Sequence, residues 1–90
     1  VMTGDQIVAA TDRYDRELEK EEIPVAEHPH DIICMMRRAA LAHLRTMFPK
    51  MVQFVSEDKI EKAMRWLGFV QGVLWVCGVY TLEQLKADNR

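Results

Sequence analysis

The stretch that decides the fold runs from Arg65 to Tyr80 and reads RWLGFVQGVLWVCGVY. Together with Ile60 and Ala63 before it, its apolar residues recur at three- and four-residue steps, as they do on one face of an α-helix. The second half of the stretch is apolar almost all the way round, so we expect this helix to be covered on more than one side. The pattern predicts a helix over 57–77, closed by Gly78, because glycine readily adopts the left-handed conformation that follows a helix.

Two glycines inside this helix, Gly68 and Gly72, form a G-x-x-x-G step. A glycine in a helix interior costs about 1 kcal/mol relative to alanine, and close approach of a second helix backbone is the usual compensation. A chain of 90 residues has few elements with which to cover such a helix. We therefore predict self-association, most simply as a two-fold homodimer. The predicted interface residues are Trp66, Gly68, Phe69, Gly72 and Trp75.

Two further helices are marked by capping boxes, in which a Thr hydroxyl and a Gln side chain each satisfy a free backbone N–H. The first box, TGDQ at residues 3–6, predicts a helix over 4–20 with one narrow apolar stripe. Such a stripe is typical of a surface helix that lies on a larger element. The second box, TLEQ at residues 81–84, predicts a short helix over 82–88.

The region between the first helix and the apolar one contains a connector and a second long helix. Residues 21–30 include two prolines, which disfavour helix in the residues before them, so we expect an extended segment. Helical periodicity then resumes and predicts a helix over 31–54, kinked or broken at Pro49. Ser56, followed by two acidic residues, resembles the start of the next helix. The sequence thus predicts an all-α fold: one domain over 1–90, built on an antiparallel helical hairpin with a short N-terminal helix and a short C-terminal helix.

The segment EHPHDIIC, residues 27–34, holds the candidate metal ligands His28, His30 and Cys34. A zinc site needs four ligands in a tetrahedral array, and the chain's remaining histidine and cysteine lie far along the sequence. The alternative is that His30 or Asp31 caps the helix over 31–54, with Cys34 in its first buried turn. We favour capping, and expect neither a bound metal nor another cofactor.

Catalytic chemistry has little support in the sequence. Cys34 and Cys77 both lie in apolar runs, where a thiol stays protonated and unreactive, and Ser56 is the only serine. We therefore expect no enzymatic activity and two reduced thiols in the core. The N-terminal residues show no basic segment before an apolar run, so we expect a cytoplasmic protein. The uncharged run over 66–82 is too short and too interrupted for a membrane span.

Basic residues in the middle of the chain raise the possibility of binding to nucleic acid or nucleotides. The formal net charge of −2 and the lack of a polar recognition helix argue against it, so this function is not favoured. The residues that would form the basic face are Arg37, Arg38, Arg45, Lys50, Lys59, Lys62 and Arg65.

The C-terminal third, EKAMRWLGFVQGVLWVCGVYTLEQLKADNR over residues 61–90, is similar to the C-terminal part of small accessory proteins of tailed phages and prophages. The RWLGFVQGVLW core, followed by a glycine and a T-L-x-x-L helix, carries this resemblance. It implies the bacterial cytoplasm during infection or lysogeny, and a non-catalytic interaction module that binds and modulates a host or phage protein. Nucleic-acid or nucleotide binding is one alternative, and a small metal-binding protein is the other.

Overall fold

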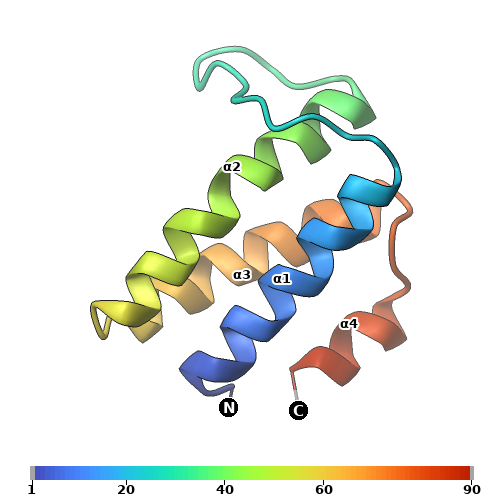
Figure 1. The fold of residues 1–90 in the computed structure, drawn as a ribbon. Helices are drawn as coiled ribbons and strands as arrows, with labels where there is room; N and C mark the ends of the chain where they lie inside the picture. The colour runs from blue at the N-terminus through green and yellow to red at the C-terminus, as the bar shows by residue number, and fades with distance from the viewer. Residues whose placement is uncertain (1, 90) are drawn as a thin grey trace.

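Four α-helices make up most of residues 2–89, the part of the chain that the computed structural model describes. The helices are α1 (Gly4–Lys20), α2 (Arg37–Ser56), α3 (Ile60–Val76) and α4 (Leu82–Asp88) (Figure 1). No strand occurs within those residues. The all-α class and the bounds of the first and last helices are confirmed, and both predicted capping boxes form. Residues 1 and 90 of the predicted domain lie outside the described range.

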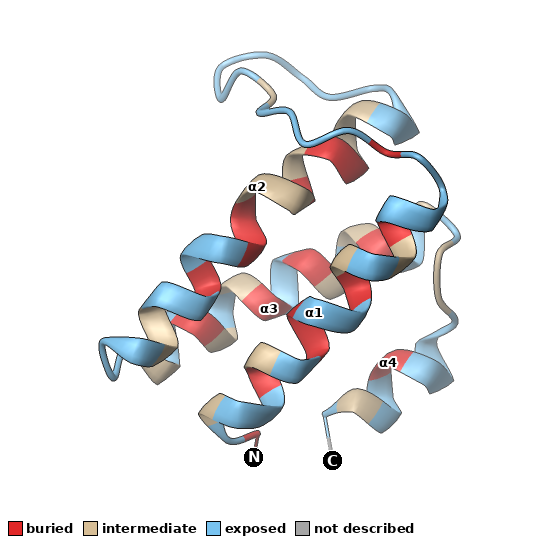
Figure 2. Cartoon of the chain, in the orientation of Figure 1, coloured by how far each residue is buried: buried red, intermediate tan, exposed pale blue. Residues whose placement is uncertain are grey.

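Helix α1 packs against both α2 and α3. Its apolar stripe is almost wholly removed from solvent, and Figure 2 shows this buried face turned towards the other helices. The stripe is narrow, yet its burial is complete because two helices cover it at once. The prediction of a surface helix that lies on a larger element is therefore confirmed, since the residues of α1 outside the stripe are not buried. The buried residues of α1 are Ile7, Ala10, Thr11, Tyr14 and Leu18.

Helices α2 and α3 form the predicted hairpin, joined by the turn at residues 57–59. Near this turn the rings of Phe54 and Trp66 meet almost perpendicularly, with centroids 4.8 Å apart. Figure 1 shows the two helices spreading apart from the turn towards the start of α2 and the end of α3.

Helix α2 differs from its predicted extent at both ends. It continues through Pro49 to Ser56, so the predicted break is absent, and the proline leaves only the carbonyl oxygen of Arg45 without its helical N–H. It begins at Arg37 rather than at residue 31. Arg37 Nε already donates to the carbonyl oxygen of Cys77, at the end of α3. If α2 began at residue 31, its six additional residues would extend roughly 9 Å beyond the end of α3. They would then have no part of α3 to pack against.

Ser56 does not cap a helix start. It is the last residue of α2, and its Oγ donates to the carbonyl oxygen of Gln53 at 2.7 Å. Helix α3 begins at Ile60 after Lys59, which makes no side-chain capping hydrogen bond.

Helices α1, α2 and α3 all end in the same turn. In each, the second residue beyond the helix has a positive φ, and the following N–H donates back to a carbonyl in the last helical turn. Gly78 occupies the positive-φ position after α3, as predicted, with φ of 73°. Glu22 and Asp58 occupy it after α1 and α2, each with φ of 60°, where a side chain is disfavoured.

Tyr14 joins the four helices. It is 1% exposed on α1, its ring lies 6.4 Å from that of Phe48 on α2, and its hydroxyl donates to Asp88 of α4 at 2.6 Å. Gln71 of α3 donates to the same hydroxyl at 3.1 Å. Burial, aided by the hydrogen bond to Asp88, raises the pKa of Tyr14, so the hydroxyl remains a donor at any physiological pH.

We expect Glu22→Gly to raise the free energy of unfolding by roughly 0.5–1 kcal/mol, because glycine adopts the left-handed conformation without the steric cost of a Cβ. Gly78→Ala is the matched opposite change and should lower it by about 1 kcal/mol. Urea unfolding of both variants measures the two effects. Equal effects of the same sign would contradict the role assigned to these turns.

Tyr14→Phe removes the hydroxyl and should lower the free energy of unfolding by about 1–2 kcal/mol, since the lost hydrogen bond was made to a charged carboxylate. Tyr80→Phe is the control, because the ring of Tyr80 lies 5.4 Å from that of Tyr14 without a hydroxyl hydrogen bond inside residues 2–89. Thermal unfolding should place Tyr80→Phe within about 0.5 kcal/mol of the parent protein.

Candidate functional site

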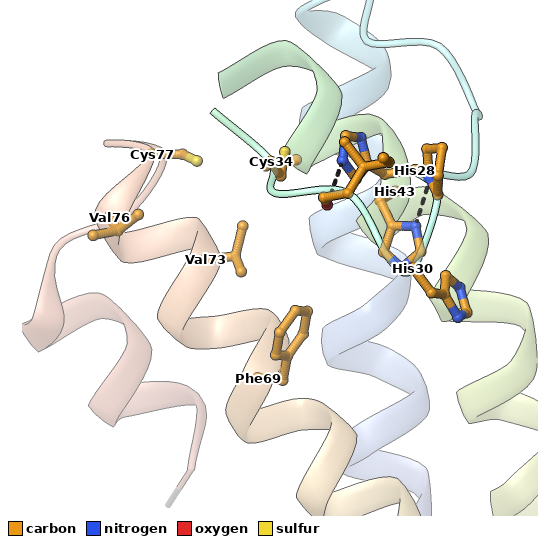
Figure 3. Close-up of a pocket in the computed structure, with 11 residues that line it drawn as sticks. His28, His30, Cys34, His43, Phe69, Val73, Val76 and Cys77 are labelled. Atoms are coloured by element: carbon orange, nitrogen blue, oxygen red, sulfur yellow. Dashed lines mark hydrogen bonds between the residues drawn. The ribbon is translucent and has the colours of Figure 1, made fainter. Parts of the chain in front are cut away.

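A pocket of about 460 Å³ occupies the opening between the connector and the C-terminal half of α3 (Figure 3). Its apolar lining comes mainly from α3. All three histidines and both cysteines of the chain also line it, although they come from three separate parts of the sequence. The lining residues are His28, Pro29, His30, Ile32, Cys34, Ala40, His43, Phe69, Val73, Val76 and Cys77.

The connector, which spans residues 21–36 in the structure, is fixed along the side of α2 by two hydrogen bonds from its own backbone, besides those that Arg38 and Arg45 donate to its carbonyl groups. The backbone N–H of His28 donates to Nδ1 of His43 at 3.0 Å, and that of Ala26 donates to the carbonyl oxygen of Ala42 at 3.3 Å. These contacts hold EHPH at the mouth of the pocket. The side chain of His43 therefore connects the wall formed by α2 to the wall formed by the connector.

The histidine side chains have distinct hydrogen-bonding roles. Because Nδ1 of His43 accepts a hydrogen bond, it carries no proton in this arrangement. Burial is the largest cause of the lowered pKa of His43, and the charge that His30 can carry is the next. His28 and Lys50 lower this pKa by smaller amounts, whereas Glu27 raises it. The rings of His30 and His43 lie 5.7 Å apart and nearly perpendicular. Neutral imidazole is thus the favoured state at this point of the pocket.

The residues proposed as metal ligands do not converge. Nε2 of His28 lies 3.0 Å from the carbonyl oxygen of Ile32, and Nε2 of His30 lies 2.9 Å from Oε1 of Glu27. Across residues 2–89, no group of three or more His, Cys, Asp or Glu side chains is placed to hold a metal ion.

The predicted role of DIIC as the first buried turn of a helix was wrong. These residues precede α2, and Cys34 is exposed, as is Ile33 at 83%. His30 and Asp31 consequently cap no helix. Cys77, by contrast, is partly buried, and burial raises the pKa of its thiol. One of the two predicted core thiols is therefore at the surface.

The outer face of α3 carries four of the five predicted interface residues. Gly68 and Gly72 are exposed, and a Cβ added at either would meet no neighbouring atom within 4 Å. Phe69 and Trp75 are 56% and 49% exposed. Trp66 instead packs inside the hairpin against Phe54. Val76, at 76% exposure, belongs to the same face and was not predicted.

The predicted basic residues do not form one continuous patch. Arg37 and Arg38 lie at the start of α2, whereas Lys59 and Lys62 lie beyond its end, and a helix of this length spans about 30 Å. Figure 1 places these regions at opposite ends of α2.

Several of these basic side chains are also paired within the chain. Arg45 is 13% exposed and donates to Asp15 at 2.8 Å and to the carbonyl oxygen of Ile23. Arg38 donates to the carbonyl oxygen of Glu22. Other pairs join Arg37 to Glu21, Lys59 to Glu57, and Lys62 to the face of the Phe54 ring.

Comparison with protein-family models, with curated proteins and with solved structures finds no match to this chain. None of the helices within residues 2–89 combines the length and the apolar character needed to cross a membrane.

We expect the stability of the protein to fall as His43 becomes protonated. The pKa of His43 lies below its ordinary value of 6.5, so its contribution to stability is full above pH 6.5 and is lost as the pH falls through the lowered pKa. His43→Asn keeps an acceptor near the Nδ1 position but cannot be protonated. Urea unfolding at pH 7.5 and pH 5 should therefore show a smaller loss of stability for His43→Asn than for the parent protein. His30→Asn removes a smaller contribution to the lowered pKa of His43 than burial makes, so it should retain most of the parent's pH dependence. Equal losses in parent and His43→Asn would refute the assignment.

Proposed function

We propose that this protein is a non-catalytic interaction module that forms a two-fold homodimer through the outer face of α3. The observation that carries the proposal is the open space above Gly68 and Gly72. The two glycines are exposed on the side of α3 away from the core, so packing within the chain does not account for them. Their helix-weakening cost of about 1 kcal/mol each would be offset by a helix from outside the chain.

Large exposed side chains flank the two glycines on both sides. With 3.6 residues per turn, Gly68 and Gly72 lie along one line of the helix, with Trp75 on one side and Phe69 and Val76 on the other. A helix that crosses at the glycines would contact these large side chains on both sides. Full burial of such a side chain contributes about 1.5–3 kcal/mol.

A second copy of α3 suits this face because a two-fold axis brings the same residues together on both sides. The glycines of the two copies would lie against each other, and the exposed aromatic side chains would flank them. The opposite face of α3 is already occupied by the core, since Ala63, Leu67, Val70 and Leu74 are buried there. The outer face is thus the part of α3 left for another chain.

The biological setting of this proposal rests on the resemblance of residues 61–90 to small accessory proteins of tailed phages and prophages. In that setting the dimer would bind and modulate a host or phage protein in the bacterial cytoplasm. A binding role also suits the pairing of Arg45 and of other predicted basic residues within the chain, which leaves fewer cations free for nucleic acid.

The dimer is tested by light scattering and native mass spectrometry at micromolar concentrations. We expect a dimer mass for the parent protein and a monomer mass for Gly72→Leu and Val76→Glu, which place a bulky or charged side chain on the outer face. Both positions are exposed, so the monomers should keep the helical circular-dichroism spectrum of the parent.

Val52→Glu is the matched control for Val76→Glu, because it makes the same change at an exposed valine on α2. This control should remain a dimer. A parent protein that is monomeric at these concentrations would refute the proposal, as would loss of the dimer in Val52→Glu together with its retention in Val76→Glu.

A further inference from the structure

The two thiols of the chain lie on opposite walls of the pocket. Cys34 belongs to the connector, and Cys77 is the first residue beyond α3. Figure 3 shows Cys77 extending from the end of α3 towards the connector segment that carries Cys34. Both cysteines are free thiols. In the sequence, α2 and α3 lie between them. The fold thus gathers the only two cysteines of the sequence at one site.

We propose that Cys34 and Cys77 form a reversible disulfide site, which low-molecular-weight disulfides oxidise and which closes the connector across the pocket. This inference does not rest on the proposed dimer, because neither sulfur belongs to the glycine face of α3, although Phe69 and Val76 line both that face and the pocket.

The wall that carries Cys34 can move at little cost. Residues 31–36 are exposed, and within residues 2–89 no backbone N–H of residues 33–36 makes a hydrogen bond. The Cys34 thiol itself makes only a weak contact, 3.6 Å from the carbonyl oxygen of Met36. A disulfide requires Cα atoms about 4.4–6.8 Å apart, and any shift that closure needs would fall on this segment, which belongs to no helix.

The wall that carries Cys77 is fixed. Its N–H donates to the carbonyl oxygen of Val73 at 2.9 Å, and its own carbonyl accepts from Arg37 Nε at 2.7 Å. The Arg37 guanidinium also lowers the pKa of Cys77, which opposes the larger effect of burial. A positive charge beside a thiol favours the thiolate, the form that attacks a disulfide. Arg37 therefore both holds Cys77 in place and assists its ionisation.

The oxidation proceeds by two thiol–disulfide exchanges. The exposed Cys34, as thiolate, attacks one sulfur of glutathione disulfide, forms a mixed disulfide and releases one glutathione thiolate. The Cys77 thiolate then attacks Sγ of Cys34, forms the protein disulfide and releases the second glutathione. The protein loses two protons and two electrons, and the two released glutathione thiolates take up two protons and carry the electrons. A dithiol reductant reverses both steps.

The test is to incubate the reduced protein at pH 8 with a mixture of oxidised and reduced glutathione. We expect the intact mass to fall by two hydrogens, free thiols to disappear, and dithiothreitol to reverse both changes. The bridge closes a loop of about 40 residues, so the melting temperature of the oxidised protein should rise by roughly 10–30 °C.

Cys34→Ser and Cys77→Ser are the controls, and the exposure of Cys34 means that its replacement should not disturb folding. Each variant should gain at most one glutathione and no internal bridge. The proposal is overturned if the parent protein carries glutathione on both cysteines, if it forms only disulfides between chains, or if the internal bridge lowers the melting temperature.

Discussion

The structure depends most on the burial of Tyr14 where the helices meet. Its ring lies against Phe48 of α2 and Tyr80 beyond α3, and its hydroxyl is held by Asp88 and Gln71. The phenol ring supplies the large buried apolar surface, while its hydroxyl satisfies a polar group that would otherwise be costly to bury. Because this one side chain contacts all the other helices, it fixes the place of α1 between α2 and α3 and brings the C-terminal helix back onto the N-terminal one.

The elements that could be predicted from sequence are those set by neighbouring residues. Thr3 and Thr81 each satisfy backbone groups within one turn, so the starts of α1 and α4 follow from four letters of sequence. The helix ends were harder to predict from sequence. Glu22 and Asp58 adopt the left-handed conformation after a helix, where glycine is the usual residue. The end of α1 at Lys20 and the turn at Gly78 were nevertheless predicted, but a helix start was placed at Ser56, where α2 actually finishes.

The candidate site could be predicted only in part, for the same reason. The glycines of α3 were found because their spacing is local, and they do lie on an exposed face. The pocket depends on contacts between distant residues, such as the hydrogen bond from His28 to His43 and the one from Arg37 to Cys77. No spacing rule encodes these pairs. The apolar residues around Cys34 also predicted burial. They are exposed because α2 begins only at Arg37, where it can contact the end of α3.

The start of α1 and the end of α4 lie on the same side of the molecule, as Figure 1 shows, and Arg13 of α1 forms an ion pair with Asp88 of α4 at 2.8 Å. A short peptide could therefore join the two ends, and the chain could be reopened in the exposed segment over 31–36, which belongs to no helix. Such a circular permutant would keep the four helices and their core intact. The connector would then consist of two free ends. The permutant would keep the helical fold but could no longer close a continuous connector over the pocket.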